Sequence, residues 1–306
     1  MKLIHLKKAV KNQNIIKIIV SVLILIFLFK FINFNLVLNT LKNVNALFLV
    51  VLVFIPINII LRAWRLMIIL NKDKKLISIK DSFYLNLAGI TLNLFMPASS
   101  GDIAKSYYGY KWHGVKEEML SANIFDKFMA LFSTFFIGIL AALYLKIYIL
   151  SFVSFLLAVF IVLIFIYPHK MPWNYLNKIV SKFLKIQLDE NKLALSFAVS
   201  NGIKLKTFLL SILAFILLYF QFYLLCLSFS IKITFIYVLA VAPLLNLAVL
   251  FPLTLNGLGS GEAMTIYLFN LINISPSMSI VVSLLSQVVN AVIPGLFGFI
   301  IIIMKR

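Results

Sequence analysis

Long apolar runs separated by short polar and mostly basic segments make up most of the chain. A helix needs about 20 residues to cross the hydrocarbon core of a bilayer, with a usual range of about 17 to 25. Six of the runs fall in or near that range, so the pattern predicts six membrane-spanning helices. They cover residues 15–32, 46–70, 119–145, 147–167, 207–229 and 279–303.

Two further apolar stretches are broken by proline and glycine. Residues 82–97 and residues 233–252 each end at a proline that is followed by a turn of small residues. We interpret them as the first arms of two re-entrant hairpins, 82–118 and 233–274, because non-helical backbone survives at membrane depth where protein or a water-filled cavity surrounds it. The expected turn residues are Pro97, Gly101, Pro252, Gly257, Gly259 and Gly261.

The positions of lysine and arginine predict how these segments run through the membrane, because cytoplasmic loops carry an excess of basic residues. If the hairpin at 82–118 enters from the cytoplasm and returns there, seventeen basic residues fall in cytoplasmic segments and four in the opposite set. Both termini are then cytoplasmic, and the hairpin at 233–274 opens to the outside. We therefore expect a multi-pass protein of the cell membrane whose two hairpins point at each other.

Opposed hairpins are typical of an inverted-topology repeat. Asp102 and Glu262 support this interpretation, since each ends a Ser-Gly-acid triplet at the turn of its hairpin. The predicted fold is an all-α polytopic helical bundle that forms a single transmembrane domain. The domain covers residues 1–306. It consists of a first half at 1–167, a cytoplasmic amphipathic connector at 168–206 and a second half at 207–306.

Composition strengthens the membrane assignment and narrows the chemistry. The chain is 63% apolar and 12% charged, with a mean hydropathy of +1.09, which excludes an ordinary soluble enzyme. Its net charge of +19 lies mostly between apolar segments and indicates topology and contact with anionic lipid, and no nucleic-acid partner is expected. A single cysteine, Cys226, and three dispersed histidines predict no disulfide, metal site or cofactor.

Charged residues inside apolar segments are the candidates for function. Arg62 and Arg65 share one helix face, where they either extend to the interface or form a paired guanidinium site for a lipid phosphate or for Asp102. Asp126 and Lys127 lie about two turns into a predicted span. They either serve function or form a local ion pair, for example between Asp126 and Lys105 or an arginine of the second span.

Asp102 and Glu262 also have two interpretations. Each follows a glycine at the expected start of a returning helix, where a carboxylate caps exposed N–H groups. The same carboxylates would suit a cationic headgroup or a coupling ion in a broken-helix transporter. The candidate headgroup-binding residues are Arg62, Arg65, Asp102, Lys105, Asp126, Lys127 and Glu262, and no catalytic residue is assigned.

In their order and spacing these motifs resemble the transmembrane region of the lysylphosphatidylglycerol synthase family. That region is the flippase part of the multiple peptide resistance factor and of its stand-alone relatives. Three departures stand out: Ser99 and Lys105 occupy positions where the family commonly has arginine, and Asp102 replaces a glutamate. The motifs that carry the resemblance are Arg62-Ala-Trp-Arg65, Asn93 to Pro97 with Gly101-Asp102 and Lys105, Asp126-Lys127, and Asn256-Gly257-Leu258-Gly259-Ser260-Gly261-Glu262.

The resemblance implies a flippase-like translocator of a lipid or lipid-linked headgroup, with membrane lipids as partners. The sequence ends at Arg306 directly after its last predicted span, so the soluble lysyltransferase domain of the complete synthase is not expected. Two alternatives remain open. One is a membrane-embedded transferase acting on a lipid-linked substrate, for which we find no base or donor motif, and the other is a non-catalytic membrane subunit with unknown protein partners.

Overall fold

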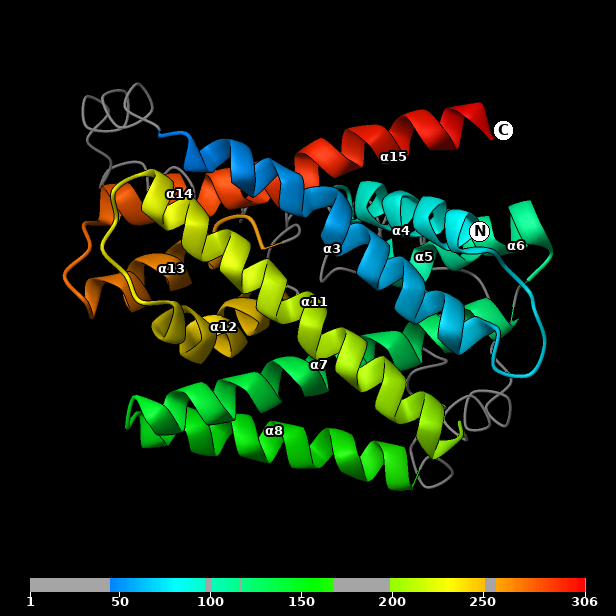
Figure 1. Ribbon diagram of the computed structural model, residues 1–306, viewed down its shortest axis with the longest axis horizontal. Helices are drawn as coiled ribbons and strands as arrows, with labels where there is room; N and C mark the ends of the chain where they lie inside the picture. The colour runs from blue at the N-terminus through cyan, green and yellow to red at the C-terminus, as the bar shows by residue number, and fades with distance from the viewer. Residues whose placement is uncertain (1–44, 97–100, 116, 168–198, 251–256, 306) are drawn as a thin grey trace, which may run out of the picture.

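The computed structural model describes residues 45–96, 101–115, 117–167, 199–250 and 257–305. Every regular element in these ranges is a helix (Figure 1). Five helices are long and apolar enough to cross a membrane, as predicted, whereas the expected span at 15–32 lies outside the described residues. They are α3 (Leu47–Leu70), α7 (Glu117–Tyr144), α8 (Tyr148–Ile166), α11 (Asn201–Ser228) and a continuous helix made of α14 (Pro276–Gln287), η2 (Val288–Val292) and α15 (Ile293–Met304).

Polar residues set several helix boundaries that hydropathy alone misplaces. The α11 helix begins at Asn201, inside the expected connector, because the Ser200 hydroxyl accepts a hydrogen bond from the Ile203 N–H and caps the helix. The rest of the connector, 168–198, lies outside the described residues. The last span widens into the π-helix η2 directly before Pro294, which has no N–H to donate to the preceding turn.

Two helical hairpins lie between the long helices. The first consists of α4 (Ile79–Asn93), α5 (Gly101–Ala104) and α6 (Ser106–His113), and the second of α12 (Phe235–Leu250) and α13 (Ser260–Asn270). The returning arm of the first, expected as one piece at 103–118, is two short helices and ends at Gly114, whose φ of 70° is left-handed. The expected turn residues Pro97 and Pro252 lie outside the described residues.

The hairpins open at opposite ends of the bundle. In the first, Asp81 near the start of α4 lies 3.6 Å from His113 at the end of α6 and 3.4 Å from Lys305 at the end of α15. In the second, the Tyr237 hydroxyl near the start of α12 donates to the Leu268 carbonyl near the end of α13. Figure 1 shows α4 to α6 gathered at the end where α15 finishes, and α12 and α13 at the other end. We call these the Lys305 end and the Tyr237 end.

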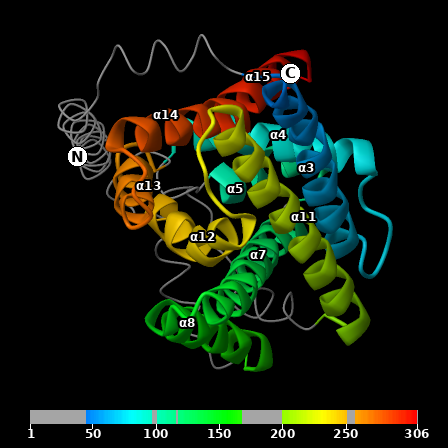
Figure 2. The same ribbon diagram turned by 60° about the vertical axis from the view of Figure 1, so that its left-hand side comes forward.

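Packing between the halves follows the same inverted pattern. The first arm of each hairpin packs on the long helix that follows the hairpin of the other half, so that α4 lies on α15 and α12 lies on α7, while α3 and α11 lie side by side (Figure 2). The acidic residue of each hairpin bonds to a partner at the same sequence separation. Asp102 bonds to Lys127, 25 residues later, and Glu262 bonds to Gln287, also 25 residues later. Equal separations in the two halves are what an inverted repeat produces.

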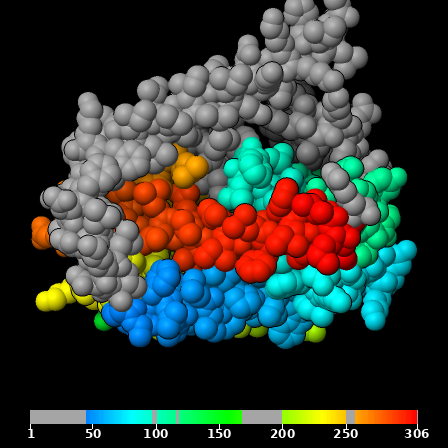
Figure 3. Space-filling view, turned by 90° about the horizontal axis from the view of Figure 1, so that it is seen from above, coloured from blue at the N-terminus to red at the C-terminus, as the bar shows by residue number. Residues whose placement is uncertain are grey.

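The outside of the bundle is apolar, as a lipid-facing surface requires. The side chains of Ile149 on α8 and Met304 on α15 are about four-fifths exposed, and several other large apolar side chains of these helices are at least half exposed. Figure 3 shows α14 and α15 running along one face of the molecule with α3 beside them. Polar side chains are instead concentrated inside, between the two hairpins.

At the Lys305 end, Asp81 lies outside the membrane-spanning helices and ties three elements together. Partial burial acts to raise the pKa of its carboxyl, but hydrogen bonds from Ser78 and Lys305 and the charge of His113 outweigh that effect. The pKa of Asp81 is therefore lowered from its ordinary value of 3.8.

Candidate functional site

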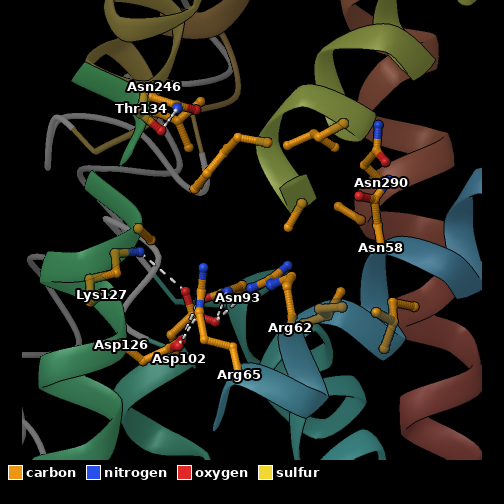
Figure 4. A pocket seen from close by; sticks show the side chains of 18 of the residues that line it. Asn58, Arg62, Arg65, Asn93, Asp102, Asp126, Lys127, Thr134, Asn246 and Asn290 are labelled. Atoms are coloured by element: carbon orange, nitrogen blue, oxygen red, sulfur yellow. Dashed lines mark hydrogen bonds and ion pairs between the residues drawn. The ribbon is translucent and has the colours of Figure 1, made fainter. Parts of the chain in front are cut away.

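A cavity of about 260 Å³ lies inside the bundle, between the end of α4, the start of α5 and the end of α12 (Figure 4). The first hairpin contributes Asn93 and Asp102 and the second contributes Asn246 and Val249, while α3, α7, α11 and the last span supply the remaining walls. Apolar side chains such as Ile59, Leu131 and Leu218 make up much of the lining. The polar lining residues are Asn58, Arg62, Arg65, Asn93, Asp102, Asp126, Lys127, Thr134, Asn246 and Asn290.

Arg65 and Asp126 form a buried two-point ion pair at one wall of the cavity. The Arg65 Nε donates to Asp126 Oδ1 at 2.5 Å and its Nη2 donates to Oδ2 at 3.0 Å. The third nitrogen, Nη1, donates to the hydroxyl of Ser211 at 2.8 Å, so the guanidinium joins α3, α7 and α11. The Arg65 side chain is only 3% exposed, and this pair is the local structural interaction that was one of the two interpretations of Asp126.

Asp102 holds a second cluster of charges, which is more open to the cavity. Its carboxylate lies 3.5 Å from the Arg62 guanidinium and 3.1 Å from the Lys127 ammonium, and it accepts a hydrogen bond from Asn93 Nδ2 at 3.2 Å. The side chains of Arg62 and Lys127 are 35% and 27% exposed, against 3% for Arg65. Arg62 and Lys127 are therefore the cations that a ligand would reach first.

Glycine at position 101 allows this cluster to form. A Cβ added at Gly101 would overlap the backbone nitrogen of Asn93 and come within 2.6 Å of its side-chain oxygen. The absence of a side chain thus lets the start of α5 approach the end of α4 closely enough for Asn93 to bond Asp102.

Lys105 lies near Asp102 but is not among the described residues that line the cavity. It is 1% exposed, and its ammonium donates to the side-chain oxygen of Asn86 at 3.0 Å. Gly89 makes room for its aliphatic stem, since an added Cβ there would come within 2.9 Å of Lys105 Cδ. Lys105 therefore adds positive charge behind Asp102 without facing the cavity.

Glu262 is fully buried and performs the capping role that was one of its two interpretations. One carboxylate oxygen accepts the N–H of Gly259 at 2.6 Å, and the other accepts from Gln287 Nε2 at 2.6 Å. The turn before it depends on glycine, because Gly257 and Gly259 have φ values of 79° and 91°. Glu262 is not among the described cavity-lining residues, so the structure separates it from the other candidates.

The structure thus brings together Arg62, Arg65, Asp102, Asp126 and Lys127, and leaves Lys105 and Glu262 outside the cavity lining. Sequence reasoning missed several uncharged polar residues of the lining, among them Asn58, Thr134 and Asn246. Asn290 of the last span also lines the cavity. An asparagine inside an apolar span is the signal that could have identified these residues.

The chemistry of this site is that of a polar binding cavity. Within the described ranges, no cluster of three or more His, Cys, Asp or Glu residues has the placement needed to hold a metal ion. Guanidinium and ammonium groups favour phosphate or carboxylate, and the apolar walls favour hydrocarbon. A ligand that combines an anionic group with an apolar part matches both.

Fold and site together define a polytopic helical membrane protein with a buried, charged cavity between two broken hairpins. The chain belongs to the lysylphosphatidylglycerol synthase transmembrane region family, which matches over residues 14–298. It is also similar to the UPF0104 membrane protein MJ1595 of Methanocaldococcus jannaschii, with 26% identity over an alignment that covers 96% of each chain. No solved structure matches the chain.

Proposed function

We propose that this protein translocates the polar headgroup of a lipid, or of a lipid-linked molecule, across the membrane. The observation that carries the proposal is the charged cavity between the two hairpins. A headgroup needs polar surroundings at the depth where hydrocarbon would otherwise exclude it. Family membership supports a lipid as the substrate, since the matching region is named for a lipid synthase.

The size of the cavity supports a headgroup as the part of the lipid that enters. A volume of about 260 Å³ lies just below the usual range for pockets that enclose drug-sized ligands. It accommodates a headgroup, whereas two complete acyl chains would not fit and would remain largely in the surrounding bilayer. The two hairpins open to opposite ends, so a small shift of each would connect this cavity first to one side and then to the other.

We further propose that the protein lies in the cell membrane with the Lys305 end in the cytoplasm, on the basis of the excess of basic residues in the segments assigned there. Single cysteines at Asp73 and Tyr148, introduced into a Cys226→Ser background, test this orientation with a membrane-impermeant thiol reagent. Labelling of Asp73→Cys from the cytoplasmic face and of Tyr148→Cys from the opposite face is expected, and the reverse pattern would contradict it.

Translocation itself is tested in proteoliposomes that contain a phospholipid labelled on its acyl chain with a fluorophore that dithionite bleaches. Protein activity makes lipid of the inner leaflet accessible, so the bleached fraction rises above the half that protein-free vesicles show. The assay is run without a gradient and with pH gradients of both signs, which covers passive and coupled transport. A bleached fraction equal to that of protein-free vesicles under all three conditions would contradict the proposal.

A pair of variants separates substrate binding from structural pairing. The variant Lys127→Gln removes one cation and leaves Asp102 paired with Arg62, so no carboxylate loses its only partner. If the charges bind the headgroup, the variant folds and its transport rate falls about tenfold or more, the usual effect of losing a hydrogen bond to a charged group. Wild-type transport in this variant would favour the non-catalytic alternative, and the exposed Lys74→Gln variant is the matched control.

A further inference from the structure

The cavity has an excess of positive charge and no carboxylate left for a second cation. Among the described residues that line it, three cations, Arg62, Arg65 and Lys127, face two carboxylates, Asp102 and Asp126. Asp126 is held at two points by Arg65, and Asp102 is shared by Arg62 and Lys127. A cationic group on a ligand would therefore compete with protein cations for both acids.

Donors remain available for an anion. A guanidinium carries five N–H donors and an ammonium three. Arg62 and Lys127 each use one contact to Asp102, and both are partly exposed. A phosphate placed between them would accept from both cations, which is the arrangement that charge-assisted hydrogen bonds favour.

A second feature concerns hydrogen-bond acceptors. The Oδ1 atom of Asn58 is buried in the cavity wall and has no partner in the described part of the protein, while the residue is 7% exposed. Two hydrogen bonds fix the orientation of the Asn58 amide. Gln221 donates through Nε2 to the Val51 carbonyl, so Gln221 Oε1 faces Asn58 and accepts from Asn58 Nδ2. The Asn58 Oδ1 atom therefore has no hydrogen-bond donor, and Figure 4 shows this side chain reaching from α3 to the cavity.

Asn93 has a similar leftover acceptor in the cavity wall. Its Nδ2 donates to the Asp102 carboxylate, which accepts only, so the Oδ1 atom faces away from that bond. This oxygen also has no partner in the described ranges, but it lies against Gly101 at the start of α5, so Asn58 is the better placed of the two acceptors. Buried polar atoms without partners are rare in folded proteins, and such atoms in a binding cavity indicate groups that a ligand satisfies.

We infer that the headgroup is a phosphate carrying hydroxyl groups, with net negative charge, and that an aminoacylated cationic headgroup is a poor ligand. This inference rests on the proposed function and specifies its substrate. The phosphate binds Arg62 and Lys127, and a hydroxyl donates to the free oxygen of Asn58. A lysyl group would bring cationic charge into a site whose carboxylates are already paired.

Competition binding tests this selectivity without requiring transport. The full-length protein in detergent is loaded with a phosphatidylglycerol labelled on its acyl chain, and unlabelled phosphatidylglycerol or lysylphosphatidylglycerol is added. Phosphatidylglycerol is expected to bind about tenfold more tightly, as an added or lost charge-assisted hydrogen bond produces. Equal or tighter binding of the lysylated lipid, or no competition by either, would overturn the inference.

Two substitutions of Asn58 test the part assigned to its oxygen. Asn58→Asp adds an acceptor with negative charge, so the preference is expected to shift toward the lysylated lipid by about tenfold. Asn58→Leu removes the acceptor and is expected to weaken phosphatidylglycerol binding about threefold. Melting curves of both variants establish that they fold, and an unchanged preference in a folded Asn58→Asp protein would overturn the assignment.

A further competition experiment distinguishes a lipid from a free phosphodiester. Water-soluble glycerophosphoglycerol has the headgroup without the chains and is expected to compete far more weakly than the lipid. Equal competition would overturn the lipid assignment. The binding result is independent of the dithionite assay, so a protein that binds with the expected preference and fails to move lipid would contradict the proposed function and leave the headgroup selectivity standing.

Discussion

At the scale of single residues, the two charged clusters of the cavity, each built around one carboxylate, differ in whether they stabilise the fold or remain available to a ligand. Arg65 and Asp126 saturate each other and are nearly excluded from solvent, which is typical of a structural pair. Arg62 and Lys127 share one carboxylate and retain donors toward the cavity, which is typical of a binding site. Burial and hydrogen-bond saturation, more than charge itself, separate the two roles.

Asp126→Asn is therefore expected to affect stability strongly. Removing one partner of a buried ion pair leaves the other charge uncompensated, which costs about 3 to 5 kcal/mol. The double variant Arg65→Gln/Asp126→Asn removes both charges and should recover a large part of this loss. Unfolding free energies of the three variants in detergent, including Arg65→Gln alone, measure the coupling, and strictly additive losses would contradict the pair.

Intramembrane charge was enough to predict most of this site from the sequence. Five of the seven charged candidates line the cavity, and the observed pairs were among the alternatives that the sequence left open, but the choice between them depends on helix packing. Asp102 and Glu262 show why. Both end the same triplet, but 25 residues later one meets lysine and the other glutamine. The first acid becomes part of a charged cavity and the second caps a helix.

At the scale of helices, close approach at glycine holds the hairpins against the long spans. Gly138 on α7 faces Pro243 on α12, and an added Cβ would overlap the proline ring. Gly202 on α11 has open space around it. The contrast between these positions tests the packing directly.

Gly138→Ala is expected to destabilise the protein by about 1 to 3 kcal/mol, the usual cost of overpacking a well-packed interface. Gly202→Ala serves as the control and should be neutral or stabilising by about 1 kcal/mol, since alanine favours the helix. Melting in detergent compares the two variants. A Gly138→Ala protein as stable as the control would contradict the α7–α12 contact.

The ties of Asp81 at the Lys305 end predict a pH dependence. Its folded pKa is lowered, so the stabilisation that it provides is present above the unfolded pKa of about 3.9 and is lost as pH falls through the folded value. The difference in unfolding free energy between wild type and Asp81→Asn should be about 1 kcal/mol or less at pH 5. It should shrink below about pH 4, and a difference that grows with acid would contradict the tie.

Helix positions followed from hydropathy, because the bilayer fixes the length of an apolar span. The ends of the helices were predicted less accurately from hydropathy. Ser200 starts α11 several residues before the predicted span, and Gly114 ends the returning arm early, since caps and turns depend on single polar residues or glycines. The orientation of each hairpin required a count of charges over the whole chain.

At the scale of the whole molecule, two inverted halves enclose one cavity, and each half supplies a broken hairpin that opens to a different end. The contact between α3 and α11 is held by polar side chains, including Asn58 to Gln221 and Arg65 to Ser211. This arrangement positions the cavity between the two ends of the bundle.

The most direct test of this account asks which part of a lipid enters the cavity. A diazirine amino acid of leucine-like size is placed at Leu131, which lines the cavity one helical turn from Lys127, and in a second protein at Phe160, which is exposed on α8. After illumination in phosphatidylglycerol vesicles, mass spectrometry maps each lipid adduct. The account predicts headgroup adducts at position 131 and acyl-chain adducts at position 160. Acyl-chain adducts at both positions, or none at position 131, would contradict it.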